Sequence, residues 1–464
     1  MTSATTIDVG ALLDDARWST YQKLLVAATA STIILDGLDN QLLGAAVPAM
    51  MREWTLKSPA FVPVQTAGMI GMMIGGAIGG VIGDRLGRRF ALIGSVLTFG
   101  ILTVFVSLSG GIGMLTVLRF FAGLGLGGAM PNAAALSSEY VPIRQRPFAV
   151  TLTIVCIPLG GSLAGLVGGQ LLPRFGWRGL FLVGGIVPLL IAALLLRVLP
   201  ESPRFLARRT DRWPQLRALL RRLGHGVSDD AEFADLREKR IAQVSARELL
   251  TPELRRDTTA LCASFFFCLL SVYIGAIWVP TLLVRAGFSV GAASYGLTAF
   301  NLGGVVGAIL GAVLIMRLGS RLTMLAMAAG AIAGAVGLAS MAIGPQSSFA
   351  VLAMLAWTGG LINAVQTTMY ALAAHVYPTG IRATGVGTAV AFGRVGGVLS
   401  PAVGSWALEA GSSRYFALIG ATMACAFAAL ASIRRHIPGA AQAGPRGGPV
   451  GEIGRAGRVG RTAT

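Results

Sequence analysis

Apolar stretches of membrane-spanning length alternate with short polar connections along most of this chain. Twelve of these stretches reach about 20 residues, the length that an α-helix needs to cross roughly 30 Å of hydrocarbon. The pattern therefore predicts an all-α membrane protein with twelve transmembrane helices. We place them near residues 22–50, 64–83, 90–110, 113–138, 148–172, 179–199, 259–285, 290–316, 322–343, 349–375, 383–407 and 413–433.

A long polar segment divides the predicted helices into two sets of six. Residues 200–258 contain thirteen basic and ten acidic side chains. The sequence repeats on either side of this segment, because DRLGRR at 84–89 returns as MRLGSR at 316–321, after the second helix of each set. Two six-helix halves are the simplest account of such a repeat. We expect an N-terminal segment at 1–21, the halves at 22–199 and 259–433, a central loop at 200–258 and a disordered tail at 434–464.

The positive charge of the chain is unevenly divided between the two sides of the membrane. The net charge is +18, although only 12% of the residues are charged. With both termini in the cytoplasm, 30 of the 38 Lys and Arg residues fall on the cytoplasmic side and 6 on the other. Cytoplasmic connections of membrane proteins are enriched in Lys and Arg, so the N-terminal segment, central loop and tail are predicted to be cytoplasmic. The charge reflects topology, and we expect no nucleic-acid partner.

The connection GDRLGRR at 83–89 is the most specific short motif. Its glycine permits a tight turn, its aspartate can cap or pair at a helix end, and its arginines supply donors at the membrane surface. The residues concerned are Asp84, Arg85, Gly87, Arg88 and Arg89.

This motif resembles the connection between the second and third helices of the major facilitator superfamily, whose members are twelve-helix secondary transporters. PESPRFL at 200–206 is similar to an element shared by sugar and organic-ion porters of that superfamily. DGLD at 36–39 and the stretches 118–140 and 381–404 together resemble the aromatic acid:H⁺ symporter family, and most of all its 3-hydroxyphenylpropionate-type members. The resemblance covers residues 20–435 and implies the major facilitator fold.

A transporter of this kind needs a gate at the cytoplasmic face. We expect the GDRLGRR residues to form it together with Glu139 and Arg144, from the end of the fourth helix. In the second half Met316 stands where Asp84 would be, and His375 stands where Glu139 would be. The acidic contacts of the gate are therefore predicted to concentrate in Asp84 and Glu139.

Four formal charges lie inside the predicted helices, where each costs about 2.5–3.5 kcal/mol unless it is paired or hydrated. They are Asp36 and Asp39 in the first helix, Arg119 in the fourth and Arg394 in the eleventh. One interpretation is purely structural pairing. The other is functional, because neighbouring carboxylates in a poorly solvated cavity bind protons more readily than in water, and an arginine can hold a carboxylate through two parallel hydrogen bonds.

The functional interpretation, which the family resemblance supports, gives each charge a role. We predict that Asp36 and Asp39 couple transport to protons and that Arg394 binds an anionic substrate. Arg119 lies close to the outer end of its helix, where it either pairs with an aspartate or guides the anion inward.

Polar and aromatic residues of the spans are candidates for the wall of a substrate cavity. Asn40 extends the polar face that carries the two aspartates. The other candidates lie on the tenth and seventh helices and are Asn363, Gln366, Tyr370, Tyr273 and Trp278. Because Tyr and Trp near helix ends often anchor a helix at the membrane interface, that alternative stays open.

The central loop contains one amphipathic stretch, WPQLRALLRRLG at 213–224. It predicts either a helix that lies on the membrane surface or a solvated helix within the loop.

Together these features predict a plasma-membrane transporter that couples protons to the uptake of a small aromatic carboxylate of the hydroxyphenylpropionate, benzoate or hydroxybenzoate type. A sugar or other organic-ion porter is the alternative within transport, but a cation site would need an acid where Arg394 stands. A membrane sensor without transport is the alternative from another class. The sequence contains no metal cluster or catalytic motif, so we expect neither an enzyme nor a cofactor other than the proton, and we expect a monomer in the lipid bilayer.

Overall fold

The computed structural model describes residues 6–14, 18–228, 230–235, 246–378 and 380–440. Within these residues, ten helices are long and apolar enough to cross a membrane. A further helix, α2, is also long enough, but it contains Asp36 and Asp39, which lower its hydropathy.

The first half consists of five long helices: α2 (Thr20–Trp54), α3 (Val62–Leu86), α4 (Arg88–Val106), α5 (Ile112–Tyr140) and α6 (Arg146–Val198). The last of these contains two spans, because the backbone turns at Gly176, whose φ of 64° is disfavoured for residues with a side chain. The second half consists of α9 (Arg255–Arg285), α10 (Val290–Leu318), α11 (Ser320–Ser340), α12 (Ser348–Val376), α13 (Arg382–Glu409) and α14 (Ser412–Ser432). With α6 counted twice, the described residues contain twelve membrane-length helices, which confirms the prediction.

Short 3₁₀ turns lie in the connections: η1 (Ser58–Phe61), η2 (Ile143–Gln145), η3 (Thr210–Arg212), η5 (Ala246–Leu250) and η6 (Pro345–Ser347).

Glycines allow α3 and α5 to pack in backbone contact. A Cβ atom at Gly71 would lie 2.1 Å from the carbonyl oxygen of Phe120, and one at Gly75 would lie 2.1 Å from that of Leu124. A larger residue at either position would force the two helices apart. Such close approach is how helices associate in lipid, where water exclusion gives no driving force.

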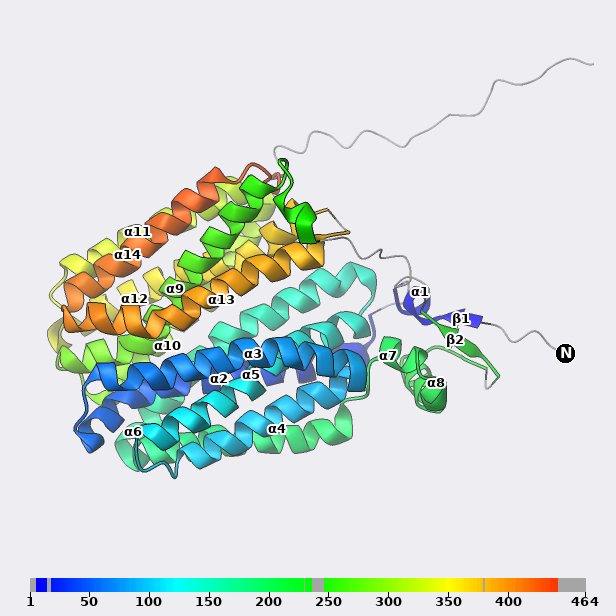
Figure 1. Ribbon diagram of the computed structural model, residues 1–464, viewed down its shortest axis with the longest axis horizontal. Helices are drawn as coiled ribbons and strands as arrows, with labels where there is room; N and C mark the ends of the chain where they lie inside the picture. Colours follow the sequence, from blue (N-terminus) through cyan, green and yellow to red (C-terminus); the bar gives the residue numbers. More distant parts are fainter. Residues whose placement is uncertain (1–5, 15–17, 229, 236–245, 379, 441–464) are drawn as a thin grey trace, which may run out of the picture.

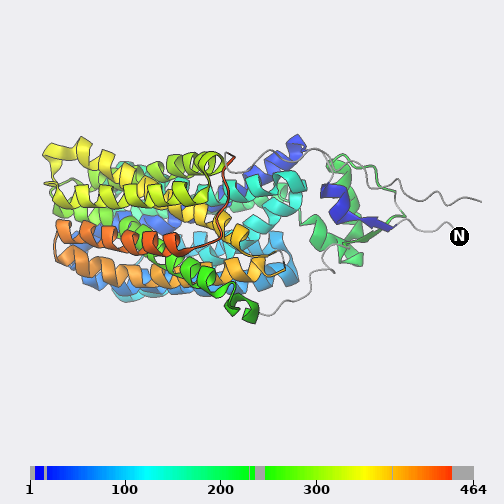
Figure 2. The same ribbon diagram turned by 90° about the horizontal axis from the view of Figure 1, so that it is seen from above.

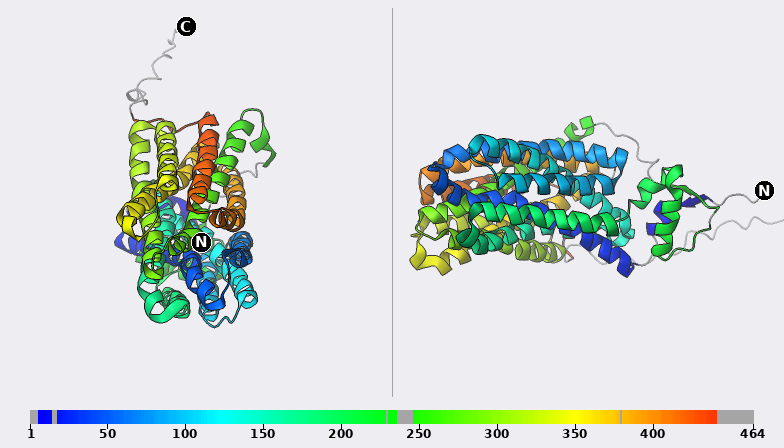
Figure 3. Two further views of the ribbon diagram at one scale, coloured as in Figure 1. Left: turned by 90° about the vertical axis from the view of Figure 1, so that its left-hand side faces the viewer. Right: turned by 90° about the horizontal axis from the view of Figure 1, so that it is seen from below.

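The helices form two bundles that lie side by side. Helices α2 to α6 pack on one another, as do α9 to α14, and the bundles meet mainly where α2 contacts α9 and α6 contacts α10 (Figure 1). Viewed from one end, the two bundles occupy separate halves of the molecule (Figure 3).

The ends of the bundle differ. A small cluster of short elements projects from one of them, here called the loop end (Figure 2). At the opposite end, here called the far end, the halves are hydrogen-bonded: Arg285 Nη2 donates to the Ser58 hydroxyl at 2.8 Å, and Gln170 Nε2 donates to the Tyr295 hydroxyl at 2.8 Å. Towards the loop end the helices of the two halves diverge (Figure 1).

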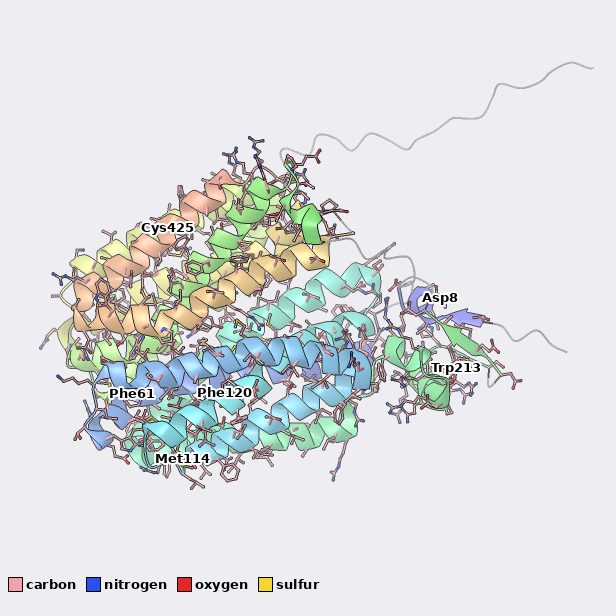
Figure 4. The ribbon with its side chains drawn as sticks, in the orientation of Figure 1. Asp8, Phe61, Met114, Phe120, Trp213 and Cys425 are labelled. Atoms are coloured by element: carbon pink, nitrogen blue, oxygen red, sulfur yellow. The ribbon has the colours of Figure 1, made fainter. Side chains whose placement is uncertain are left out.

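The small cluster combines the start of the chain with the central loop. It contains β1 (Thr6–Asp8), α1 (Val9–Asp14), α7 (Pro203–Ala207), α8 (Trp213–Arg222) and β2 (Glu232–Ala234), with β1 and β2 paired in parallel. Figure 4 shows Asp8 and Trp213 in this cluster, at the opposite end of the molecule from Phe61. The prediction of a helix near 213–224 is thus confirmed, but its apolar face contacts neither membrane nor solvent. Leu216, Leu219 and Leu220 are buried against Val9 and Leu13.

In each half, the segment that follows the last helix is hydrogen-bonded to the connection after the second helix. In the first half, the backbone N–H of Arg89 donates to the Glu201 carboxylate at 3.0 Å. In the second half, the backbone N–H of Ser320 donates to the Ile437 carbonyl oxygen at 2.9 Å. Residues 434–440, expected to belong to a disordered tail, are therefore hydrogen-bonded to this connection, whereas 441–464 lie outside the described residues.

Replacing Gly87 by alanine is expected to destabilise the first of these connections. Gly87 has a φ of 116°, and a Cβ atom there would lie 2.3 Å from Glu201 Oε2. Backbone strain of this kind costs about 1–3 kcal/mol. Thermal unfolding of the detergent-purified protein should show a lower melting temperature for Gly87→Ala. The control is Gly80→Ala, because a Cβ atom at Gly80 would have no neighbour within 4 Å; an equal loss in both variants would contradict this account.

Candidate functional site

A cavity of about 80 Å³ lies between the two halves, at the middle of the helices. Its polar wall comes from both bundles. The polar residues that line it are Asp36, Asn40 and Gln41 on α2, Tyr273 on α9, Asn301 on α10, Asn363, Gln366 and Tyr370 on α12, and Arg394 on α13. Seven of the residues predicted from the sequence therefore meet in one place, namely Asp36, Asn40, Tyr273, Asn363, Gln366, Tyr370 and Arg394.

The apolar wall is rich in methionine and is contributed largely by the first half. Met69, Met72 and Met73 come from α3, and Met130 comes from α5. Thioethers make favourable contacts with aromatic rings and adapt to irregular shapes. The cavity can therefore hold a flat apolar group beside its polar wall.

Arg394 enters this cavity from the second half. Its Nη1 donates to the Met72 carbonyl oxygen at 3.3 Å, and Gly76 makes room for the guanidinium, since a Cβ atom there would lie 2.5 Å from Nη1. Within the described part of the chain, Arg394 has no acidic partner within ion-pair distance. A guanidinium that is only half buried and has most of its donors unused is suited to bind a carboxylate.

The two aspartates have different surroundings. Asp36 faces the cavity, and its Oδ1 is buried without a hydrogen-bond partner among the described residues. Asp39 is fully buried behind it, 3.1 Å from Arg119 Nη1, and accepts a hydrogen bond from the Thr103 hydroxyl. Arg119 therefore pairs with an aspartate, which was one of its two predicted roles, and it does not line the central cavity.

Removal of Asp39 should cost more stability than removal of Asp36. Asp39→Ala leaves the Arg119 charge buried and unpaired, which costs about 3–5 kcal/mol, whereas the double variant with Arg119→Met removes both charges and should recover much of that loss. Melting temperatures of purified variants check this, with Asp36→Ala as the comparison because Asp36 forms no ion pair with another residue that the structure describes. A double variant less stable than Asp39→Ala would refute the pairing argument.

The aromatic and amide residues of α12 and α9 lie mostly as expected. The Tyr370 ring packs edge-on against Phe265, with centroids 5.3 Å apart, and Gln366 lies one turn away on the same face. Trp278 differs, because its indole N–H donates to the Pro401 carbonyl oxygen at 3.2 Å and the side chain is buried between α9 and α13.

Gln41 and Asn301 are cavity residues that sequence reasoning missed. Gln41 Nε2 donates to Asn301 Oδ1 at 3.1 Å, and Asn301 Nδ2 donates to Gln41 Oε1 at 2.7 Å, so a reciprocal amide pair joins the two halves at the cavity. The available signal was polarity, since Gln41 follows the DGLDN stretch and Asn301 lies in the middle of an apolar span.

Three of the predicted gate residues, Asp84, Arg88 and Glu139, meet at the loop end. Arg88 forms an ion pair with Asp84 and lies 3.9 Å from Glu139, which accepts a hydrogen bond from the Ser202 hydroxyl. The side chain of Arg85 is exposed, although its carbonyl oxygen accepts from Arg209 at 3.2 Å. PESPRFL therefore supplies contacts to this group and is more than a marker of resemblance.

Arg144 does not join the predicted gate. It is exposed in η2 and contacts neither Asp84 nor Glu139, whereas the neighbouring Arg146 pairs with Asp14 of the small cluster. The reason is local, since η2 turns the chain so that position 144 points to solvent and position 146 points inward.

The second half lacks acids at the positions that correspond to Asp84 and Glu139, but an acid at another position makes contacts at the loop end. Asp257, at the start of α9, accepts from the backbone N–H of Arg434 at 2.8 Å and lies 3.9 Å from Arg435. His436 lies 3.2 Å from the Ser320 hydroxyl, and burial lowers its pKa. The charge arrangement at the loop end is therefore not symmetric between the halves.

The sequence profile of the Major Facilitator Superfamily matches residues 29–401 and 261–456, and the chain belongs to this family of membrane transporters. It is 34% identical to the gallate transporter of Pseudomonas putida over 87% of this chain and 90% of that protein. It is 33% identical to the 4-hydroxybenzoate transporter PcaK of Pseudomonas aeruginosa, covering 94% and 98% of the two chains. A 3-(3-hydroxy-phenyl)propionate transporter of Escherichia coli is 32% identical, with coverages of 82% and 85%.

Solved structures show the same fold. The xylose transporter XylE of E. coli, in a partially occluded inward-open conformation, matches with a TM-score of 0.67 at 17% identity, covering 88% of this chain and 97% of that one. An inward-facing, occupied bacterial homologue of the human lysosomal transporter Spinster matches with a TM-score of 0.66 at 17% identity, covering 90% and 97%.

Proposed function

We propose that this transporter couples protons to the uptake of a small aromatic carboxylate. The observation that carries the proposal is Arg394, which forms no ion pair with any described residue and lines a central cavity walled by methionine and tyrosine. The arginine binds the carboxylate, and the thioethers and aromatic rings contact the ring of the substrate. The similar transporters are named for gallate, 4-hydroxybenzoate and 3-(3-hydroxy-phenyl)propionate, which are all such acids.

Asp36 and Asp39 carry the coupling protons in this proposal. Asp36 shares the cavity with the substrate, so its charge acts directly on the bound anion. Asp39 gains a proton only when it releases Arg119, which links its protonation to the packing of α2 against α5. Asn40, Gln366 and Tyr370 then hydrogen-bond substituents of the ring.

The loop end is the cytoplasmic end in this proposal, with both termini inside and the protein in the plasma membrane as a monomer. The excess of Lys and Arg in the segments of the loop end supports this orientation. The far-end contacts then close the outside, and the Asp84, Arg88 and Glu139 group, with Arg85, Gly87 and Arg89, belongs to the gate that closes the inside.

An uptake panel tests the function. Cells that express the protein are offered radiolabelled 4-hydroxybenzoate, benzoate, a hydroxyphenylpropionate, xylose and an organic cation, with and without a protonophore. Uptake of an aromatic acid that the protonophore abolishes is the expected result. Uptake of xylose or of the cation in place of the acids would show another porter, and the absence of any uptake by correctly inserted protein would favour a sensor.

A further inference from the structure

Two buried hydrogen-bond donors near the Asp39–Arg119 pair have no partner among the described residues. They are Nε of Arg119 and Nε2 of Gln65, on side chains that are 4% and 5% exposed. Buried donors are almost always satisfied by protein or by an ordered water, because an unmade hydrogen bond in the interior is costly. Two such donors in one place indicate an acceptor between them.

Both side chains line the same small cavity of about 10 Å³, and Asn40 lines it as well. Gly123 in its wall lets α5 approach α3 closely, since a Cβ atom there would lie 2.3 Å from the Gly68 carbonyl oxygen. A cavity of roughly 10–15 Å³ is the smallest that holds one water molecule, and that water needs two to four polar partners. The size and the three polar residues fit one water.

Asn40, Met69, Met72 and Leu126 line both cavities, so the small cavity adjoins the central one, and Asn40 is the polar side chain among these four. On the other side, Arg119 holds Asp39 through Nη1, leaving Nε for the small cavity. The groups that face Asp39 are therefore Arg119 from α5, the Thr103 hydroxyl from α4 and Asp36 one turn earlier on α2. Asp36 in turn faces Arg394 from α13 and Tyr273 from α9.

We propose that one ordered water binds between Arg119 Nε and Gln65 Nε2, donates to the Asn40 side chain, and links the Asp39–Arg119 pair to the substrate cavity. Gln65 is then a positioning residue for proton coupling, although it touches neither a coupling carboxylate nor the central cavity. This inference rests on the proposed function.

The link works through Arg119. When Asp39 takes a proton, its carboxyl loses its charge and holds Arg119 less tightly. The guanidinium then shifts, and the bridging water passes this shift to Asn40, which shares the cavity wall with Asp36 and Tyr273. The protonation of Asp39 thereby changes the affinity for the substrate, and by reciprocity the substrate changes the proton affinity of Asp39.

The test compares substrate affinity at pH 6 and pH 8 for the purified full chain and for Gln65→Met, which keeps the length of the side chain and removes the donor. The probe is radiolabelled 4-hydroxybenzoate. The affinity of the original chain for the probe should differ about tenfold between the two pH values, which is within the usual range of coupling between sites. Gln65→Met should reduce this ratio to about threefold or less. Its affinity at the pH of tighter binding should change little. The control is Val64→Ala, which alters the volume of the same cavity and none of its donors.

Different failures have different meanings. If the original chain binds no aromatic acid, the proposed function fails. If it binds with a pH dependence that Gln65→Met leaves unchanged, the water link is wrong. If Gln65→Met does not fold, a high-resolution density map of the original protein decides, because a dry cavity with Gln65 Nε2 bonded directly to protein would overturn the proposal, and a water peak between Gln65 and Arg119 would support it.

Discussion

Replacement of Arg394 by alanine should weaken binding of an aromatic carboxylate by about 30-fold or more, because the loss of one partner of a desolvated charge pair costs roughly 2–5 kcal/mol. The residue lies half buried at the middle of α13 and forms no ion pair with a described residue, although Asp36 lines the same cavity. Its side chain also contacts the first half through the Met72 carbonyl oxygen, so the bound anion would join both bundles at one guanidinium.

Arg394→Lys is the matched variant, since it keeps the charge and loses the planar pair of donors. We expect it to fall between the original protein and the alanine variant when equilibrium binding to purified protein is measured. Unchanged affinity in Arg394→Ala would remove Arg394 from the binding site. Unchanged affinity in Arg394→Lys alone would show that the positive charge is sufficient for binding and would exclude bidentate recognition.

Replacement of Asp36 by asparagine should abolish proton-driven accumulation and leave exchange of labelled for unlabelled substrate in place. A single proton that crosses with the substrate down one pH unit can support about tenfold accumulation, so the internal concentration of substrate should fall to the external one. Asp36 faces the cavity with Oδ1 unpaired, so asparagine fits without breaking an ion pair.

The measurement is uptake into proteoliposomes with an imposed pH difference, next to exchange in the same vesicles without one. Asp211→Asn is the control, because Asp211 is an exposed acid in the small cluster of the loop end. Accumulation that persists in Asp36→Asn would exclude this carboxylate from the coupling mechanism, whereas loss of both accumulation and exchange would indicate a role in substrate binding.

The fold was accessible from the sequence because its strongest determinant is local. Each span must be apolar over its whole length. The polar residues between the fifth and sixth spans therefore separated them in the sequence, although the two helices are continuous except for the turn at Gly176. The charges of the spans were equally visible, since an acid or base in lipid stands out against its surroundings. Their separation into Arg394 at the cavity and the Asp39–Arg119 pair behind it depends on how the helices are rotated, which no single span encodes.

Other features depended on contacts between distant segments. Sequence reasoning treated residues 1–21 and 200–258 as separate pieces, but the Thr6–Asp8 strand pairs with Glu232–Ala234 across more than two hundred residues. The amphipathic pattern of 213–224 indicated an apolar face without indicating what would cover it. Arg144 and Arg146 look alike in sequence, and only the turn at η2 decides which of them points inward.

The hydrogen bonds that join the halves at and beyond the central cavity have a consequence for scarce substrates. Opening the far end must break the Arg285–Ser58 and Gln170–Tyr295 bonds and the reciprocal Gln41–Asn301 pair. If each bond contributes about 0.5–1.5 kcal/mol net, only a small fraction of molecules is open at that end at any moment. A solute arriving there binds with an apparent dissociation constant equal to the intrinsic one divided by that fraction. If the far end faces outward, as proposed, these bonds would raise the concentration that a cell needs in order to take up the solute.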